Sequence, residues 1–245
     1  KGDILEISPE TLFQEDGYAI WCQCPGCEAI MPTDAGKFSG ASDRNIYLAN
    51  QVCCLIRQKH PDKGVITFAY SFSSKLPKRV CPEPNVQILY CYYHENDPAI
   101  APERTNSLAE ILEWKKITNG NFSIYTYQYL YPALQMAEPT TLSAAFRAFA
   151  VLGMRGSVQE SRENWGTLDA YLVYLGGRLG VDPFLDETAV RRDYFNTLYG
   201  AAGRTMQYYY ESAAEALTPK DGQVFYVGWH FFPKITERQI VGINA

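Results

Sequence analysis

The sequence contains no long apolar run and no excess of basic charge. Its 245 residues hold 22 Lys and Arg against 27 Asp and Glu, which gives a formal net charge of −5. A membrane-spanning helix needs about 20 predominantly apolar residues, and no stretch of the chain approaches that length. Nucleic-acid-binding surfaces carry a basic balance, which is missing here. The composition therefore predicts neither a membrane span nor a nucleic-acid partner.

The chain also lacks the short motifs of several enzyme classes. It has no glycine-rich phosphate loop, no serine nucleophile elbow and no His-Glu-x-x-His zinc motif. Its seven cysteines are too few and too unevenly spread for a disulfide scaffold. Cys22, Cys24 and Cys27 lie close enough in sequence to suggest zinc or an iron–sulfur cluster. No second Cys-x-x-Cys supplies a fourth ligand, so a disulfide tether or free thiols are favoured, and we predict no metal or other cofactor.

Aromatic residues, in contrast, are abundant. They make up 14% of the chain, and 18 of them are Tyr. Tyr and Trp combine a flat apolar face with a polar tip, which suits amphipathic ligands such as sugars. Packing in a core is the commoner role of any single ring, so this signal needs support from position in the fold.

Five short apolar runs alternate with helical patterns along the first two thirds of the chain. The runs cover residues 4–8, 65–70, 86–92, 122–129 and 154–160, with predicted loops at 9–41 and 73–85. A strand followed by a helix and another strand predicts parallel pairing, because parallel strands need a crossover connection. In such folds, catalytic and binding groups gather at the carboxyl ends of the strands. We therefore expect an α/β fold with its site at that edge.

Capping residues and a change of pattern suggest two regions. Ser42 and Asp43 offer N-caps for a first long helix, and Ser107 begins a capping box for a second. We predict a β/α region over residues 1–165 and a helical extension with a strand-like tail over 166–245. Five β/α units are fewer than the eight of a closed barrel. Either the sheet is open, or amino-terminal units lie outside this chain.

Carboxylates near the strand ends are the leading candidates for chemistry. Glu160 closes the run 154–160, so we expect it at the mouth of a cleft, where partial desolvation suits it to general-acid work. The alternative is an ordinary loop carboxylate that caps the next helix. Asp16 follows Glu15 and precedes Gly17, and this pair could bind sugar hydroxyls. Asp-Gly is also a common turn dipeptide, and the turn is favoured for Asp16.

Aromatic and imidazole groups end the other predicted strands. The candidates for lining a sugar site are Tyr70, Tyr92, His94, Tyr127 and Trp165. His94 could hydrogen-bond a ligand or act as an acid or base, and a structural bond to loop backbone is an equal alternative. Each tyrosine taken alone is more often a core residue.

Several sequence elements together match a known family. The specific ones are Trp21-Cys22-x-Cys24-x-x-Cys27 and Gly153-x-x-Gly156-x-x-x-Glu160. Weaker pieces include Ile7-Ser8-Pro9, Asp16-Gly17, Asn50-Gln51-Val52, His60-Pro61-Asp62-Lys63, Pro84-Asn85-Val86 and Asp182-Pro183. With these elements the chain resembles a bacterial family of unknown function that is grouped with glycoside-hydrolase TIM barrels and related to α-glucuronidase-like proteins.

The resemblance implies a fold, a substrate class and a setting. It implies a (β/α)8 TIM-barrel-like fold followed by a helical segment, a carbohydrate ligand, and a secreted or periplasmic bacterial protein. This chain begins at an element that follows the first barrel strands in the family, so we expect the carboxyl-terminal part of a barrel, with upstream strands from the same protein. The family often has two glutamates where this chain has Gln159-Glu160, which leaves Glu160 to carry the match.

Three hypotheses for function follow. The first is a glycoside hydrolase in which Glu160 acts with a second carboxylate, either Asp16, Glu6 or a residue upstream of this chain. The second is a non-catalytic carbohydrate-binding module on a degenerate barrel. The third and weakest is a metal-dependent enzyme that uses the cysteine cluster.

Overall fold

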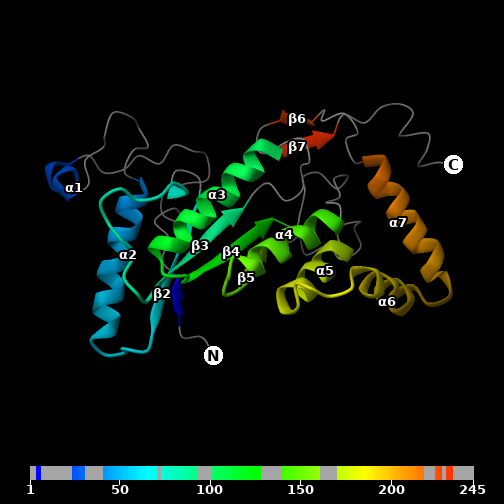
Figure 1. The fold of residues 1–245 in the computed structure, drawn as a ribbon, viewed down its shortest axis with the longest axis horizontal. Helices are drawn as coiled ribbons and strands as arrows, with labels where there is room; N and C mark the ends of the chain where they lie inside the picture. The colour runs from blue at the N-terminus through cyan, green and yellow to red at the C-terminus, as the bar shows by residue number, and fades with distance from the viewer. Residues whose placement is uncertain are drawn as a thin grey trace. The chain divides into compact units, whose positions relative to one another are not determined.

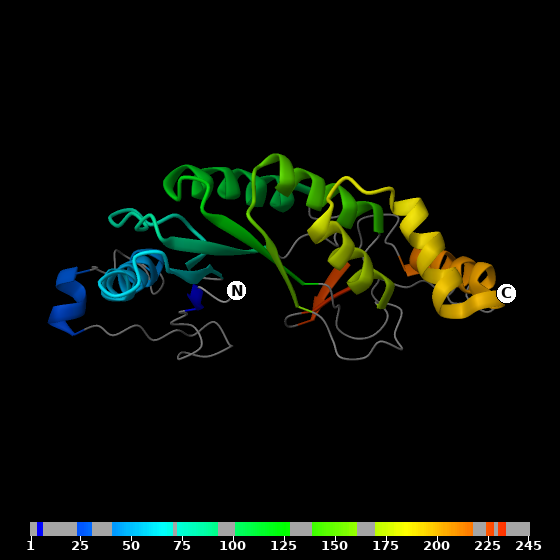
Figure 2. The ribbon, with the colours of Figure 1, turned by 90° about the horizontal axis from the view of Figure 1, so that it is seen from below.

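The computed structural model describes most of the chain, and Figures 1 and 2 show it as a ribbon. The described residues are 4–6, 24–30, 41–70, 73–92, 101–127, 139–160, 170–217, 224–227 and 230–233. The chain divides into two compact units. Unit 1 consists of Lys1–Cys91, Ser107–Tyr125 and Gly153–Gly156, and unit 2 consists of Tyr92–Asn106, Thr126–Leu152 and Ser157–Ala245.

Five described strands form one sheet in the order β1-β2-β3-β4-β5. Their bounds are Ile4–Glu6, Gly64–Ala69, Val86–Tyr92, Phe122–Tyr127 and Ser157–Glu160. The pairs β1–β2 and β2–β3 are parallel. Arg155 N–H donates to Phe122 O and Ile124 N–H to Gly156 O, so the chain leading into β5 advances in the same direction as β4. The predicted parallel α/β sheet is thus confirmed, and it is consistent with part of a β/α barrel.

In unit 1, β2 packs against the helix α2, which spans Ala41–Arg57. Burial alternates along β2, with Val65 and Ala69 fully buried, because successive side chains of a strand point to opposite faces. On α2, Ala49 and Cys53 are fully buried at helical spacing. The two periodicities therefore bring one face of each element into the same core.

The helix α3, Ala101–Ile117, lies along one face of β3 and β4 (Figures 1 and 2). Trp114 is buried in this layer, and its Nε1 donates to the carbonyl of Ser74 at 2.7 Å. The hydroxyl of Tyr90 on β3 donates to the Glu110 carboxylate at 3.0 Å. These two bonds fix the helix against the sheet and against the segment that joins β2 to β3.

Two predicted helix starts were wrong. The helix α3 begins at Ala101, so Ser107 lies inside it rather than at its N-cap. Pro102 in the first turn is compatible with this earlier start, because proline lacks only an N–H that the first turn leaves unpaired. The helix α2 begins at Ala41, so Ser42 and Asp43 lie within its first turn.

Unit 2 holds the carboxyl-terminal helices. The helices are α4 (Pro139–Val151), α5 (Ala170–Val181), α6 (Glu187–Tyr199) and α7 (Gly203–Leu217). A single turn of 3₁₀-helix, η4 (Gly200–Ala202), joins α6 to α7, which lie side by side (Figures 1 and 2). Asp186 caps α6, since its carboxylate accepts from Thr188 N at 3.0 Å and Ala189 N at 3.2 Å.

Two smaller elements lie near the ends of the chain. The predicted strand-like tail forms an antiparallel hairpin of β6 (Val224–Val227) and β7 (His230–Pro233). A short helix, α1 (Pro25–Ile30), lies within the predicted loop 9–41. The predicted boundary at residue 165 falls between 161 and 169, outside the described residues. No helix in the described part of the chain is both long and apolar enough to cross a membrane.

Candidate functional site

Glu160 is the last residue of β5, as the strand-end pattern predicts. Its side chain is half-buried. Ser157 and Gln159, which are every second residue of β5 and share one face of the strand, lie against the helix α5. Because strand side chains alternate between faces, Val158 and Glu160 point to the face of β5 opposite α5. Val158, on the same face as Glu160, is 44% exposed.

Two glycines on α5 allow this strand and helix to approach closely. A Cβ at Gly176 would collide with the carboxamide of Gln159. A Cβ at Gly180 would lie 3.2 Å from Ser157 Oγ and 3.8 Å from Gln159 Nε2. The four-residue spacing puts both glycines on the same side of the helix. Gln159 therefore occupies the space that the missing side chains of Gly176 and Gly180 leave on α5. Because Gln159 faces α5, Glu160 points to the opposite side of β5.

The neighbouring strands end in the tyrosines that the sequence analysis selected. Tyr92 closes β3 and Tyr127 closes β4, so both belong to the carboxyl edge of the sheet. The ring of Tyr92 is 1% exposed and packs edge-on against Phe149 of α4, with ring centroids 5.1 Å apart. This packing gives Tyr92 a core contact, and its role in ligand binding stays a prediction.

Tyr70 belongs to unit 1 and follows β2 directly. Its carbonyl oxygen accepts from Ser73 N–H at 2.9 Å. Asn45 on α2 holds the end of β2, because its Nδ2 donates to Phe68 O at 2.7 Å and its Oδ1 accepts from Thr67 Oγ1 at 2.8 Å. The carboxyl end of β2 is therefore fixed by side chains, and half-buried Tyr70 sits on a rigid base.

The remaining predicted site residues lie outside the described part of the chain. They are Asp16, His94 and Trp165, and the same holds for Cys22 of the cysteine cluster. Within the described residues, no group of three or more His, Cys, Asp and Glu could hold a metal ion. The structure thus places Glu160, Tyr70, Tyr92 and Tyr127 at carboxyl strand ends.

The sequence analysis missed the role of Asp43. Its carboxylate, 4% exposed, accepts the backbone N–H groups of Lys78 at 3.1 Å, Arg79 at 2.7 Å and Val80 at 3.0 Å. A buried carboxylate is tolerated when backbone donors satisfy it. Asp43 thus clamps the segment between β2 and β3 rather than capping its own helix. An Asp on the apolar face of a predicted helix indicates that its carboxylate needs buried hydrogen-bond donors. The sequence does not indicate which backbone segment supplies them.

At the amino edge of the sheet in unit 1, two asparagines make the same pattern of hydrogen bonds. Asn85 and Asn121 each directly precede a strand, and each donates its amide to two carbonyls near the start of the preceding strand. Asn85 Nδ2 bonds Pro61 O at 3.3 Å and Lys63 O at 2.9 Å, and Asn121 Nδ2 bonds Pro84 O at 3.2 Å and Val86 O at 3.0 Å. The sequence signal is an Asn immediately before an apolar strand.

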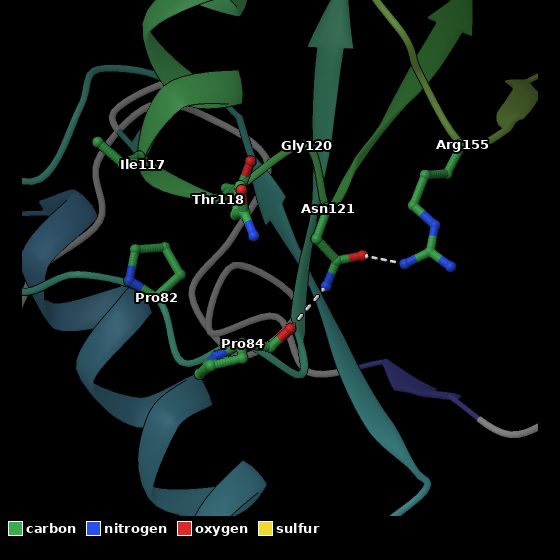
Figure 3. Close-up of a pocket in the computed structure, with 8 residues that line it drawn as sticks. Pro82, Pro84, Ile117, Thr118, Gly120, Asn121 and Arg155 are labelled. Atoms are coloured by element: carbon green, nitrogen blue, oxygen red, sulfur yellow. Dashed lines mark hydrogen bonds between the residues drawn. The ribbon is translucent and has the colours of Figure 1, made fainter.

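A pocket of about 530 Å³ opens beside Asn121, at the amino end of β4. We call it the amino-edge pocket, and its lining residues are Pro82, Pro84, Ile117, Thr118, Asn119, Gly120, Asn121 and Arg155. Figure 3 shows Asn121 between Pro84 and Arg155, with Arg155 Nη1 donating to Asn121 Oδ1 at 2.9 Å. None of the predicted site residues lines this pocket.

Comparison with known proteins gives one match. No curated protein and no solved structure matches the chain. A protein family described as a domain of unknown function matches residues 10–211, which is most of the sequence. This confirms the resemblance to a family of unknown function, whereas the relation to glycoside hydrolases stays a prediction. The chain belongs to the DUF4838 family.

Proposed function

We propose that this chain carries one catalytic carboxylate of a glycoside hydrolase, and that this carboxylate is Glu160. The observation that carries the proposal is the placement of Glu160 at the carboxyl end of β5, on the face opposite α5. In parallel β/α folds this edge is where catalytic groups gather. A half-buried carboxyl group beside a sheet edge suits proton donation to a glycosidic oxygen.

The proposal includes a second carboxylate and a fold. Most glycosidases use two carboxyl groups, whose separation decides between retention and inversion. Glu6 closes β1 and is one candidate partner, and Asp16 is another. We propose that the parallel sheet forms part of a (β/α)8 barrel, that a carbohydrate is the substrate, and that the protein is secreted or periplasmic in a bacterium.

Substitution of the proposed acid tests the assignment. We expect Glu160→Gln to lower turnover of an active glycan by about 10²- to 10⁴-fold, because a general acid contributes that much to the rate. A panel of polysaccharides and nitrophenyl glycosides provides the assay. Glu113→Gln is the matched control, since Glu113 is exposed on α3 and pairs with Lys116. Undiminished turnover in Glu160→Gln, with a normal melting temperature, would reject Glu160 as the acid.

A second candidate function is glycan binding without hydrolysis. Among the described strands, only β1 and β5 end in a carboxylate, Glu6 and Glu160. The strands β2, β3 and β4, which lie between these two in the sheet, end without a carboxylate. A barrel in which Glu160 has no partner carboxylate within reach of the same sugar would bind without cleaving. Wild-type protein that binds a glycan by titration calorimetry, yet releases no product from it, would favour this alternative.

A further inference from the structure

The amino-edge pocket of unit 1 combines apolar side chains with two amides and one cation. Its volume of about 530 Å³ falls within the range of small-molecule pockets. Three strand-connecting segments build it: the chain at 82–84, the α3–β4 turn at 117–121, and Arg155 before β5. Pro82, Pro84 and Ile117 give it apolar walls.

The charge of this pocket differs in sign from the charge of the chain. The chain carries a net charge of −5, yet the only charged residue in the lining is Arg155. No carboxylate of the described residues pairs with Arg155. Glu83 lies between the two lining prolines in sequence, but its carboxylate pairs with Arg57 at 3.2 Å. The charged side chain that lines the pocket is therefore a cation, which attracts an anion.

One hydrogen bond tethers the exposed guanidinium of Arg155 to the pocket wall. Nη1 donates to Asn121 Oδ1 at 2.9 Å, and Asn121 is itself anchored by its two bonds to Pro84 and Val86 (Figure 3). Among the described residues, Asn121 is the only hydrogen-bond partner recorded for the Arg155 side chain. A guanidinium with one donor occupied keeps further donors in its fork for a carboxylate. Preorganisation of this kind lowers the entropy cost of binding.

The turn beside the arginine adds a neutral polar group. Asn119 is an exposed residue with φ of 52°, in the left-handed region that side chains other than Asn and Asp rarely adopt. The following Gly120 has φ of 77°. The N–H groups of Asn119 and Gly120 donate to carbonyls in the last turn of α3, and that of Asn121 donates to Thr118 O, so hydrogen bonds hold the turn. The amide of Asn119 is thereby presented at the pocket from a fixed backbone.

We propose that the amino-edge pocket binds a small organic carboxylate with a flat apolar body. Arg155 takes the carboxylate, Asn119 takes a neighbouring polar atom, and the proline rings and Ile117 cover the apolar body. The site is separate from the catalytic assignment, because none of its lining residues belongs to the carboxyl edge of the sheet.

Chemical-shift mapping of the whole chain with benzoate tests this proposal. Benzamide serves as the matched neutral probe, because it has the same ring without the charge. We expect benzoate, but not benzamide, to shift the backbone amides of Gly120, Asn121 and Arg155. Equal shifts with both probes, or no shifts at these amides up to the solubility limit of benzoate, would overturn the proposal.

Substitutions of Arg155 sharpen the test. Because a hydrogen bond to a charged group is worth about 1.5–3 kcal/mol, we expect Arg155→Gln to weaken benzoate binding at least about tenfold. Arg155→Lys keeps the charge but loses the planar fork, so its loss should be smaller. Arg178→Gln on α5 is the control and should bind as wild type. The Arg155 side chain is exposed, so all variants should fold, which thermal melts check. Unchanged affinity in Arg155→Gln would sink the assignment.

Discussion

Different kinds of internal contact stabilise unit 1 and unit 2. In unit 1, polar side chains bond backbone groups that are distant in the sequence, as the buried Asp43 and Asn45 and the half-buried Asn121 do. In unit 2, aromatic rings of α5, α6 and α7 pack on one another around Phe195. Hydrogen bonds are directional and fix the positions of strand ends, whereas ring packing supplies burial with loose angular demands.

The difference shows how side chains of unit 1 are positioned, whereas Glu160 belongs to unit 2, where Gln159 of the same strand contacts α5. A hydrogen bond from a side chain to specific backbone atoms loses most of its stabilising free energy when those atoms move. Such a bond therefore favours one geometry. An aromatic cluster tolerates small shifts while it keeps its buried area. The clamps of unit 1 lie next to Tyr70 and next to the amino-edge pocket. Substitutions in the two units should therefore differ in the size of the stability loss and in where that loss is localised.

The largest effect should follow removal of the central ring of unit 2. Phe195 is 1% exposed and lies within 5.0–6.0 Å, centroid to centroid, of Tyr171, Tyr194, Tyr199 and Tyr210. We expect Phe195→Ala to lower the free energy of unfolding by about 3–5 kcal/mol through lost burial and a cavity.

Urea denaturation followed by circular dichroism measures this loss, and hydrogen exchange locates it in α5 to α7. The control is Tyr208→Ala, because Tyr208 is 72% exposed on α7. If both variants lost the same stability, the ring cluster would not be what holds this unit together.

A smaller but more localised effect should follow loss of the Asp43 clamp. Asp43→Ala leaves three backbone N–H groups without their acceptor, and we expect a loss of about 3 kcal/mol. Asp43→Asn keeps one acceptor oxygen and should lose less.

Hydrogen exchange at the amides of Arg79 and Val80 provides the readout, since both should become fast in Asp43→Ala. The matched control is Asp62→Ala, at a carboxylate that is 70% exposed. Amides at residues 78–80 that keep their protection would show that the segment does not depend on this clamp.

The smallest effect is a dependence on alkaline pH that belongs to unit 2. Burial, with a smaller contribution from Tyr199, raises the pKa of Tyr194 from 10.0 to about 12. Burial also raises the pKa of Tyr171 and of Tyr210 well above the usual range. The folded state therefore holds these phenolic protons more tightly than the unfolded chain does. The resulting stability is present below pH 10 and falls as the pH rises from 10 towards the folded pKa.

Urea midpoints at neutral and at strongly alkaline pH check this expectation. Tyr194→Phe removes one titrating group, so its stability should fall less than that of wild type between the two pH values. Tyr208→Phe, at an exposed position, should leave the difference unchanged. An identical alkaline loss in wild type and Tyr194→Phe would contradict the assignment of the effect to the buried ring.

Local patterns in the sequence predicted most of the elements. On α5, the stripe of Tyr171, Leu172, Leu175 and Leu179 is buried, as its helical spacing predicts. The parallel sheet followed from alternation of strand and helix signals, and the strand-end rule located Glu160. These features depend on residues within one turn or one strand of each other, which is why pattern alone finds them.

The contacts that position the strand ends were beyond such reasoning. Asp43 meets Arg79 across 36 positions of the sequence, and Asn45 meets Phe68 across 23. The position of Asp43 just before the first predicted long helix indicated an N-cap, because Asp is one of the residues preferred at that position. Only tertiary structure decides between a local and a distant backbone partner. The cavity at the amino edge is likewise built from three turns that no local pattern connects.

The fit of Gln159 into the glycines of α5 has an evolutionary consequence. A Cβ at Gly176 would meet the far end of the flexible Gln159 side chain, so a larger residue at 176 requires Gln159 to move or to be replaced by a shorter residue. We expect natural variation at these two positions to be paired, with an alanine at 176 accompanied by a short residue at 159. Glu160 would keep its orientation through such exchanges, because the combined volume of residues 159 and 176 would stay the same although each residue changes.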